Sequence, residues 1–354
     1  MTFERSVGAS IRLTPGPLLR VLGLGLAVVG CEDARSHQQV EPRDRAIAQP
    51  APVVTPAPAD MPGHAPVPSG HMDSKDGDPI VGSGGGAQSP PSASKLRFAA
   101  LGDYGSSGKA EQQVAELVLA LQLDFVITTG DNNYPGGAAA TIDENIGQYY
   151  GDLIHPYKGG YGSSATENRF FPTLGNHDWV AAGAQPYLDY FTLPGNERYY
   201  DIVRGNVHFF AIDSDVHEPD GIVADSVQAQ WLKRGLAAST SAFDVVAMHH
   251  PPYSSGPHGS TVALQWPYAA WGAEVVFAGH DHCYERLEID GATYVVSGLG
   301  GRSIYSFGLP VEGSLVRYND QYGITVVEAD ANELQLSFVT VDGELIDSTK
   351  IAAH

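Results

Sequence analysis

Five short blocks of polar residues have the composition needed to hold a pair of metal ions. Each block follows an apolar run and supplies aspartate, asparagine, tyrosine or histidine, which bind metals through oxygen or nitrogen. Two adjacent metal ions need a bridging carboxylate, oxygen ligands for the harder ion and imidazoles for the softer ion. Five such blocks in succession therefore predict a dinuclear metal site. They are GDYG (102–105), GDNNY (130–134), GNHD (175–178), VAMH (246–249) and GHDH (279–282).

The apolar runs before these blocks have the pattern of β-strands. Runs 96–101 and 125–129 lead into Gly102-Asp103 and Gly130-Asp131, with an amphipathic stretch at 111–123 between them. This order predicts a βαβ unit in which each parallel strand delivers an aspartate at its carboxyl end. The remaining three blocks follow apolar runs in the same way, at 170–174, 243–248 and 275–278.

Other parts of the chain have the pattern of antiparallel hairpins. Runs 199–203 and 207–212 flank Arg204-Gly205-Asn206, and the alternating C-terminal runs contain an Asp342-Gly343 turn. Helices are expected at 228–238 and at 262–271, the second interrupted by Pro267. Parallel units combined with hairpins predict an α/β fold of two facing mixed sheets with helices outside and ligands at the strand ends.

The charge of the chain restricts the classes of partner. The 354 residues carry a net charge of −21, and a surface this acidic repels nucleic-acid backbones, so no nucleic-acid partner is expected. An acidic protein that handles phosphate needs local positive charge at its site, and bound metal ions supply it. The charge therefore favours a metal-built anion site over one built from lysine and arginine.

The N-terminal segment predicts export. Residues 1–31 contain three arginines, then the apolar run 21–30 and Cys31, and this run is too short to span a bilayer. The tetrad 28–31 resembles a bacterial lipobox, which would lipidate Cys31, and ordinary signal cleavage nearby is the alternative. We expect either a cell-envelope lipoprotein, held at the membrane only through this lipid anchor, or a secreted or periplasmic protein.

The segment after the export signal predicts a tether. Residues 32–94 are dominated by proline, glycine, serine and alanine, and such a segment cannot bury enough apolar surface to offset its ordering entropy. We therefore expect disorder there and one folded domain at 95–354. The two cysteines of the chain, Cys31 and Cys283, lie in the export region and directly after the GHDH block, so no disulfide is expected.

The five blocks resemble those of the calcineurin-like metallophosphoesterases, and within them the purple acid phosphatases. The resemblance covers residues 96–305, and Tyr134, three residues after Asp131, distinguishes the purple acid phosphatase branch from the wider superfamily. It implies a four-layer αββα sandwich of two mixed sheets, with a dinuclear metal site at the carboxyl ends of the strands. It also implies a phosphate ester as the substrate.

The resemblance assigns a role to each metal-binding residue. Asp103, Tyr134 and His282 would ligate Fe(III), and Asp131 would bridge the two ions. The other three would hold a divalent ion, which is iron, zinc or manganese across the family. In chain order the implied ligands are Asp103, Asp131, Tyr134, Asn176, His249, His280 and His282.

Two further histidines resemble the family's catalytic residues. His177 follows an asparagine ligand and would lie beside the substrate, and His258, nine residues after His249, would protonate the leaving group. The implied reaction is the hydrolysis of a phosphoric monoester, in which hydroxide formed at the ferric ion attacks phosphorus in line.

Three other functions remain as alternatives. A phosphodiesterase or nucleotidase on the same scaffold is disfavoured by Tyr134, which such relatives usually lack. A Ser/Thr phosphoprotein phosphatase is disfavoured because Tyr134-Pro135 replaces the Arg-Gly of that class. A non-catalytic surface lipoprotein would be favoured by the loss of a ligand, and no ligand is lost.

Several neighbours of the blocks are expected to have structural roles. His250 is interpreted as a structural residue and Asp178 as one that caps a turn or orients His177. Asp215 and His217 are expected on a solvated loop. The glycine run 298–301 resembles an anion cradle, although a lone glycine run is weak support for one.

Overall fold

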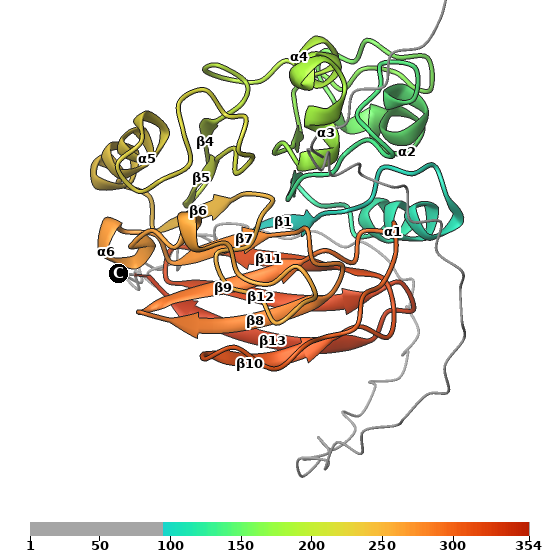
Figure 1. The fold of residues 1–354 in the computed structure, drawn as a ribbon. Helices are drawn as coiled ribbons and strands as arrows, with labels where there is room; N and C mark the ends of the chain where they lie inside the picture. Colours follow the sequence, from blue (N-terminus) through green and yellow to red (C-terminus); the bar gives the residue numbers. More distant parts are fainter. Residues whose placement is uncertain (1–94, 354) are drawn as a thin grey trace, which may run out of the picture. The chain divides into compact units, whose positions relative to one another are not determined.

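The computed structural model describes residues 95–353. The predicted export signal ending at Cys31 and the predicted tether at 32–94 lie outside the described residues. The described part of the chain contains two β-sheets and their flanking helices (Figure 1). Within it, no helix is long and apolar enough to cross a membrane.

The first sheet, called sheet A, combines parallel and antiparallel strands. It has six strands in the order β13-β12-β11-β1-β2-β3, with β1, β2 and β3 parallel and the remaining pairs antiparallel. β1 is paired on both sides, and its last four residues are fully buried, as expected for a central strand. Its strands are β1 (Leu96–Leu101), β2 (Phe125–Thr128), β3 (Phe170–Phe171), β11 (Gly323–Ala329), β12 (Glu333–Thr340) and β13 (Leu345–Ala352).

The second sheet, called sheet B, is also mixed. It has seven strands in the order β10-β8-β9-β7-β6-β5-β4, of which β5, β6, β7 and β9 are parallel, while β4, β8 and β10 pair antiparallel with their neighbours. The strands are β4 (Tyr200–Arg204), β5 (Val207–Ala211), β6 (Phe243–Ala247), β7 (Val275–Ala278), β8 (Tyr284–Ile289), β9 (Ala292–Ser297) and β10 (Ser314–Tyr318).

The main hydrophobic core joins the two sheets. Tyr284 of β8 stacks on Phe338 of β12 with ring centroids 4.2 Å apart, and the Ser297 hydroxyl of β9 donates to the Ala100 carbonyl of β1. A second core joins sheet B to helices α5 (Val227–Ala238) and α6 (Tyr268–Trp271). Helix α1 (Lys109–Ala120) packs against sheet A through its buried valines.

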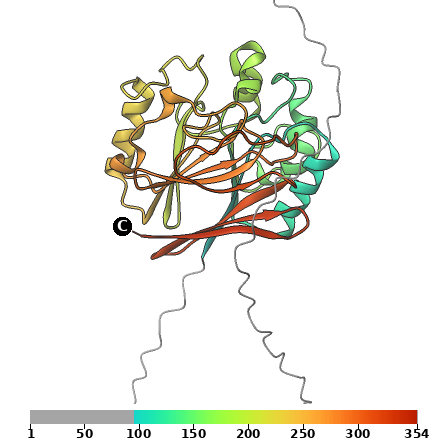
Figure 2. The same ribbon diagram turned by 60° about the horizontal axis from the view of Figure 1, so that its bottom comes forward.

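The predicted four-layer arrangement of two mixed sheets with outer helices is confirmed. In Figure 2, α1 (cyan) and α5 (gold) lie on opposite sides of the sheets. Pro267 separates α6 from a short 3-10 turn at Val262–Leu264, as predicted. The strand predicted at 170–174 is only two residues long. Its next residue, Pro172, has no N–H to pair, and the Pro172 carbonyl instead accepts from the hydroxyls of Tyr187 and Tyr200.

Short helices fill the long connections that the sequence left without predicted structure. They are α2 (Gln148–Tyr150), α3 (Asn176–Val180) and α4 (Gln185–Tyr190), with single π or 3-10 turns at Asp143–Gly147, Gly151–Leu153 and Ala182–Ala184. Helix α3 begins at a predicted ligand, so the connection after β3 positions part of the candidate site.

Candidate metal centre

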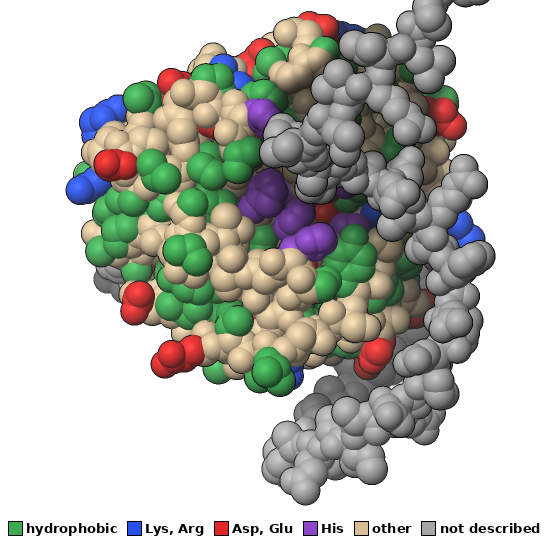
Figure 3. Space-filling view, in the orientation of Figure 1, with side chains coloured by type: hydrophobic (Ala, Val, Ile, Leu, Met, Phe, Trp, Pro, Cys, Tyr) green, Lys and Arg blue, Asp and Glu red, His purple; other side chains and the backbone are tan. Residues whose placement is uncertain are grey.

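The segments that follow five strands converge, and both sheets contribute. β1, β2 and β3 are parallel, as are β6 and β7, so within each sheet the carboxyl ends lie at one edge. Histidine side chains gather in a hollow on this face (Figure 3). Asp103 follows β1, Asp131 and Tyr134 follow β2, Asn176 begins α3, His249 follows β6, and His280 and His282 follow β7.

Four of the predicted ligands form a first cluster around the Tyr134 hydroxyl. This oxygen lies 2.8 Å from Asp131 Oδ2, 3.3 Å from Asp103 Oδ1 and 3.3 Å from His282 Nε2. His282 Nε2 is also 3.2 Å from Asp103 Oδ1. The four side chains come from three different strand ends and direct their ligand atoms toward one point.

The other predicted ligands form a second cluster around His249. Its Nε2 lies 2.9 Å from Asn176 Oδ1, 3.2 Å from His280 Nδ1 and 3.4 Å from Asp131 Oδ1. Asp131 therefore belongs to both clusters, with Oδ2 in the first and Oδ1 in the second. A carboxylate shared in this way has the geometry that a bridging ligand requires.

The charges of these side chains fit a cationic occupant. Asp103 and Asp131 are almost completely buried, and among the described residues no lysine or arginine forms an ion pair with either. Burial, Asp103 and Asp178 raise the pKa of Asp131 well above its usual range. Burial and the neighbouring carboxylates likewise raise the pKa of Tyr134. A cation would stabilise the anionic form of each.

The histidines are suited to bind metal as neutral imidazoles. Burial and the neighbouring histidines lower the pKa of His249 well below its usual range and the pKa of His280 to about 3. His249 Nδ1 lies 2.8 Å from the Thr129 carbonyl, which can only accept, so Nδ1 carries the proton and Nε2 is free to bind metal. His282 Nδ1 lies 2.6 Å from the Ser303 hydroxyl, and this hydrogen bond orients the ring.

Unusual backbone conformations aim the ligands into the centre. Asp103, Asp131 and His280 have φ values of 58°, 52° and 68°, in the left-handed region that non-glycine residues rarely adopt. Each such residue costs on the order of 1–3 kcal/mol, and such conformations cluster at functional sites. Gly175 allows a further close approach, because a Cβ there would overlap the backbone N and Oδ1 of Asp131.

The two predicted catalytic histidines lie next to different clusters. The His177 ring centroid is 4.5 Å from that of Tyr134, and its Nε2 is 3.9 Å from Asp131 Oδ2. The exposed His258 has its ring centroid 4.2 Å from that of His280. Both rings thus border the centre without entering either cluster.

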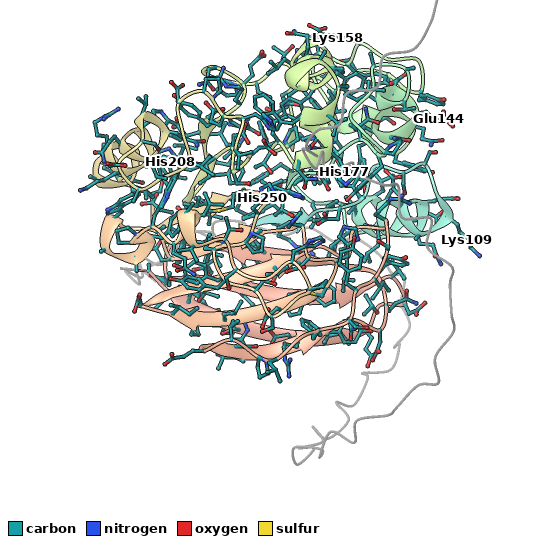
Figure 4. The ribbon with its side chains drawn as sticks, in the orientation of Figure 1. Lys109, Glu144, Lys158, His177, His208 and His250 are labelled. Carbon is teal, nitrogen blue, oxygen red and sulfur yellow. The ribbon has the colours of Figure 1, made fainter. Side chains whose placement is uncertain are left out.

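One of the neighbouring residues behaves as predicted, and a second has a further possible role. Asp178 caps the turn at Gly175 and accepts from the Gly175 backbone N–H at 2.9 Å. His250 lies beside His249 with its Nδ1 3.0 Å from the Ser214 hydroxyl. Together with His249 and His280 it forms a group of imidazoles that could hold a metal ion, so its structural role stays a prediction. Figure 4 labels His177 in α3 and His250 in the segment after β6.

Other expectations for this region need correction. His217 is exposed as predicted, but Asp215 is buried and accepts from the backbone and ring nitrogens of His217. The run 298–301 directs the Gly300 N–H at the Gly102 carbonyl, 2.9 Å away, so this N–H is used within the protein.

Three residues at the edge of the centre were not predicted from the sequence. Arg302 lies over the Tyr134 ring, with Cζ 5.0 Å from its centroid, and Tyr305 stacks on His282. The buried Asp281 contacts the loop that carries His258. Only Asp281 had a signal in the sequence, since it separates the two histidines of the GHDH block.

Comparison with protein families identifies the fold. The family model described as calcineurin-like phosphoesterase matches residues 96–284. The chain belongs to the calcineurin-like phosphoesterase family. This confirms the resemblance that the five blocks predicted, and the family implies a dinuclear metal centre and a phosphate ester substrate.

Curated relatives of this family member include purple acid phosphatases. Tartrate-resistant acid phosphatase type 5 of Rattus norvegicus is 25% identical over 305 residues, which cover 73% of this chain and 91% of that protein. Purple acid phosphatase 3 of Arabidopsis thaliana is 25% identical over 298 residues, which cover 72% of this chain and 77% of that protein.

Solved structures share the fold at lower identity. GAP50, described as the anchor in the inner membrane complex of Plasmodium, superposes with a TM-score of 0.59 at 20% identity, covering 74% of this chain and 90% of that one. Purple acid phosphatase PPD1 from yellow lupin superposes with a TM-score of 0.58 at 18% identity, covering 75% of this chain and 55% of that one. A named phosphatase and a named anchor share this fold, so function must be argued from the centre itself.

Gly175→Ala tests whether both clusters depend on the close approach to Asp131. The added Cβ would displace the shared carboxylate, so affinity for both metal ions should fall on the order of 10- to 100-fold, as when groups that orient metal ligands are changed. Metal titration of the metal-free variant measures this. Gly160→Ala is the control, because its Cβ would lie 3.9 Å from the nearest atom. Wild-type affinity in Gly175→Ala would contradict the predicted dependence.

Proposed function

We propose that this protein is a phosphoric monoester hydrolase of the purple acid phosphatase type, with Fe(III) and a divalent iron, zinc or manganese ion. The observation that carries the proposal is the position of the Tyr134 hydroxyl, 2.8 Å from Asp131 Oδ2 and 3.3 Å from both Asp103 Oδ1 and His282 Nε2. A phenolate and two carboxylates are hard ligands that favour a trivalent ion. This cluster therefore supports a ferric site.

The second cluster suits the divalent ion. Asn176, His249 and His280 offer one amide oxygen and two imidazole nitrogens, which suit iron, zinc or manganese. Asp131 would complete both coordination spheres. When bound, the metal pair would supply a hydroxide nucleophile at acidic to neutral pH and positive charge against the phosphoryl oxygens.

The two histidines at the border would act on the substrate from different sides. His177 Nδ1 lies 2.6 Å from the Pro135 carbonyl, so Nδ1 carries the proton and the partly exposed ring is held beside Tyr134. His177 would thus orient the phosphoryl group. His258 is exposed at the His280 side and would donate a proton to the departing alkoxide.

Two alternatives use the same fold. A phosphodiesterase or nucleotidase would need the same metal pair, and Tyr134 in the centre argues for the monoesterase. A non-catalytic surface lipoprotein is suggested by the likeness to GAP50, which is described as an anchor. The complete set of metal-binding side chains in this chain argues against that alternative. Export and lipidation at Cys31 remain proposals from residues 1–31.

Tyr134→Phe tests the ferric assignment. The oxidised, metal-replete protein should absorb visible light through charge transfer from the Tyr134 phenolate to iron, and the variant should lose this band while remaining folded. Visible spectroscopy with circular dichroism measures both properties. Tyr150→Phe is the control, since Tyr150 is fully buried outside both clusters and its hydroxyl has no partner among the described residues. A colourless, fully active wild type containing only zinc or manganese would refute the ferric assignment.

His258→Ala tests the leaving-group role. Because only a poor leaving group needs a proton in the transition state, alkyl esters should lose about 10²–10⁴-fold in kcat and aryl esters should change little. Steady-state kinetics on the two ester classes measures this, with metal content expected to stay normal. His217→Ala, at a histidine whose side chain is 72% exposed, should leave both rates unchanged. If His258→Ala slows both ester classes equally, the leaving group is protonated by His177 or by water and not by His258.

A further inference from the structure

The loop that carries His258 is folded around a buried carboxylate. Asp281 is completely buried, and its Oδ1 accepts from the His258 backbone N–H at 2.9 Å. Its Oδ2 accepts from the Ser254 hydroxyl at 2.5 Å and from the Gly259 backbone N–H at 3.3 Å. Three donors spread over six residues of the loop therefore end on one side chain.

The fit between the loop and Asp281 is tight. A Cβ on Gly256 would overlap the carboxylate carbon of Asp281, so only glycine lets the loop backbone pass this close to Asp281. The Ser254 hydroxyl, which donates to Asp281, also accepts from the Gly256 backbone N–H at 2.9 Å. The carboxylate thus determines the path of the backbone that leads to His258.

Asp281 also has a fixed position relative to the metal centre. It lies between His280 and His282, one from each cluster, and the turn is closed by hydrogen bonds from its N–H to Gly279 and from Cys283 to its carbonyl. The Asp281 carboxylate is therefore carried by the same closed turn as one ligand of each cluster. The His258 ring, in turn, lies against the His280 ring, with centroids 4.2 Å apart.

We propose that Asp281 is a positioning residue that holds His258 at the leaving-group side of the metal centre. It ties the loop of the proposed general acid to the same turn that presents His280 and His282. The proton for the leaving group would come from His258, and Asp281 would take no part in the proton transfer. This inference rests on the proposed role of His258.

A second buried carboxylate provides a matched control. Glu285, completely buried in β8, accepts from the Ser255 backbone N–H and hydroxyl, so it holds the same loop. Unlike Asp281, it accepts no hydrogen bond from His258 or Gly259 in the described part of the chain, and it lies beyond the metal-binding turn. General loosening of the loop should follow from a change at either carboxylate, whereas loss of His258 position should follow only from a change at Asp281.

The test compares Asp281→Asn with Glu285→Gln on alkyl and aryl phosphate esters. Asparagine keeps the shape of the side chain but cannot accept from all three donors. Asp281→Asn should slow alkyl ester hydrolysis about tenfold or more in kcat, with little change for aryl esters, because only the general-acid contribution is lost. Glu285→Gln should not change the ratio of the two rates, and both variants should keep the wild-type metal content.

A double variant distinguishes positioning from independent effects. If Asp281 acts through His258, adding Asp281→Asn to His258→Ala should cause no further loss on alkyl esters. Additive losses, or a fall in metal content with Asp281→Asn, would overturn the proposal. If Asp281→Asn does not fold, Ser254→Ala removes one of the three contacts and should give a smaller loss with the same dependence on the leaving group.

The outcomes also separate this inference from the proposed function. If His258→Ala shows no dependence on the leaving group, the proposed role of His258 fails. If His258→Ala shows that dependence and neither Asp281→Asn nor Ser254→Ala does, only the positioning role of Asp281 fails.

Discussion

The arrangement of the whole centre depends on one buried carboxylate that is shared between two clusters. Asp131 directs Oδ2 at Tyr134 and Oδ1 at His249. Tyr134 follows a strand of sheet A and His249 follows a strand of sheet B, so the separation of these two strand ends must allow both side chains to reach one carboxyl group. The packed core between the sheets fixes this separation, because close-packed interiors do not deform gradually. The sandwich is thus the scaffold that makes a shared ligand feasible.

The centre contains several features that would be destabilising if they occurred elsewhere in the protein. Two buried carboxylates lie close together, and three residues with left-handed backbone lie two or three residues after strand ends. Each feature opposes folding of the metal-free chain, and bound cations would relieve the electrostatic part. Local departures of this kind are expected where function, more than stability, determines the structure. The surrounding strands, which are regular and buried, compensate for them.

The sequence was informative where local pattern and chemistry coincide. Apolar runs ending in Gly-Asp or Gly-His predicted β1, β2 and β7 and brought the right side chains together, because strand ends lie at one edge of a sheet. The short helices α2, α3 and α4 were not predicted, since each is too short to show a hydrophobic period. The contacts of Asp281 with residues 254–259 join segments more than twenty positions apart, and no local pattern encodes such contacts.

The burial of Asp215 escaped prediction for a similar reason. Its partners are the backbone and ring of His217, and together they form a compact turn that a polar sequence does not distinguish from a solvated loop. Arg302 and Tyr305 escaped because only tertiary structure brings the segment after β9 to Tyr134 and His282.

The most direct test of the account is the metal content of Asp131→Ala compared with His280→Ala and the wild type. Because Asp131 is shared and His280 belongs to one cluster, the account predicts about two ions per chain in the wild type, about one in His280→Ala and close to none in Asp131→Ala. Elemental analysis of the purified proteins, after exposure to equal concentrations of iron and zinc, measures this. An Asp131→Ala protein that retains about two ions per chain would contradict the shared carboxylate and the account built on it.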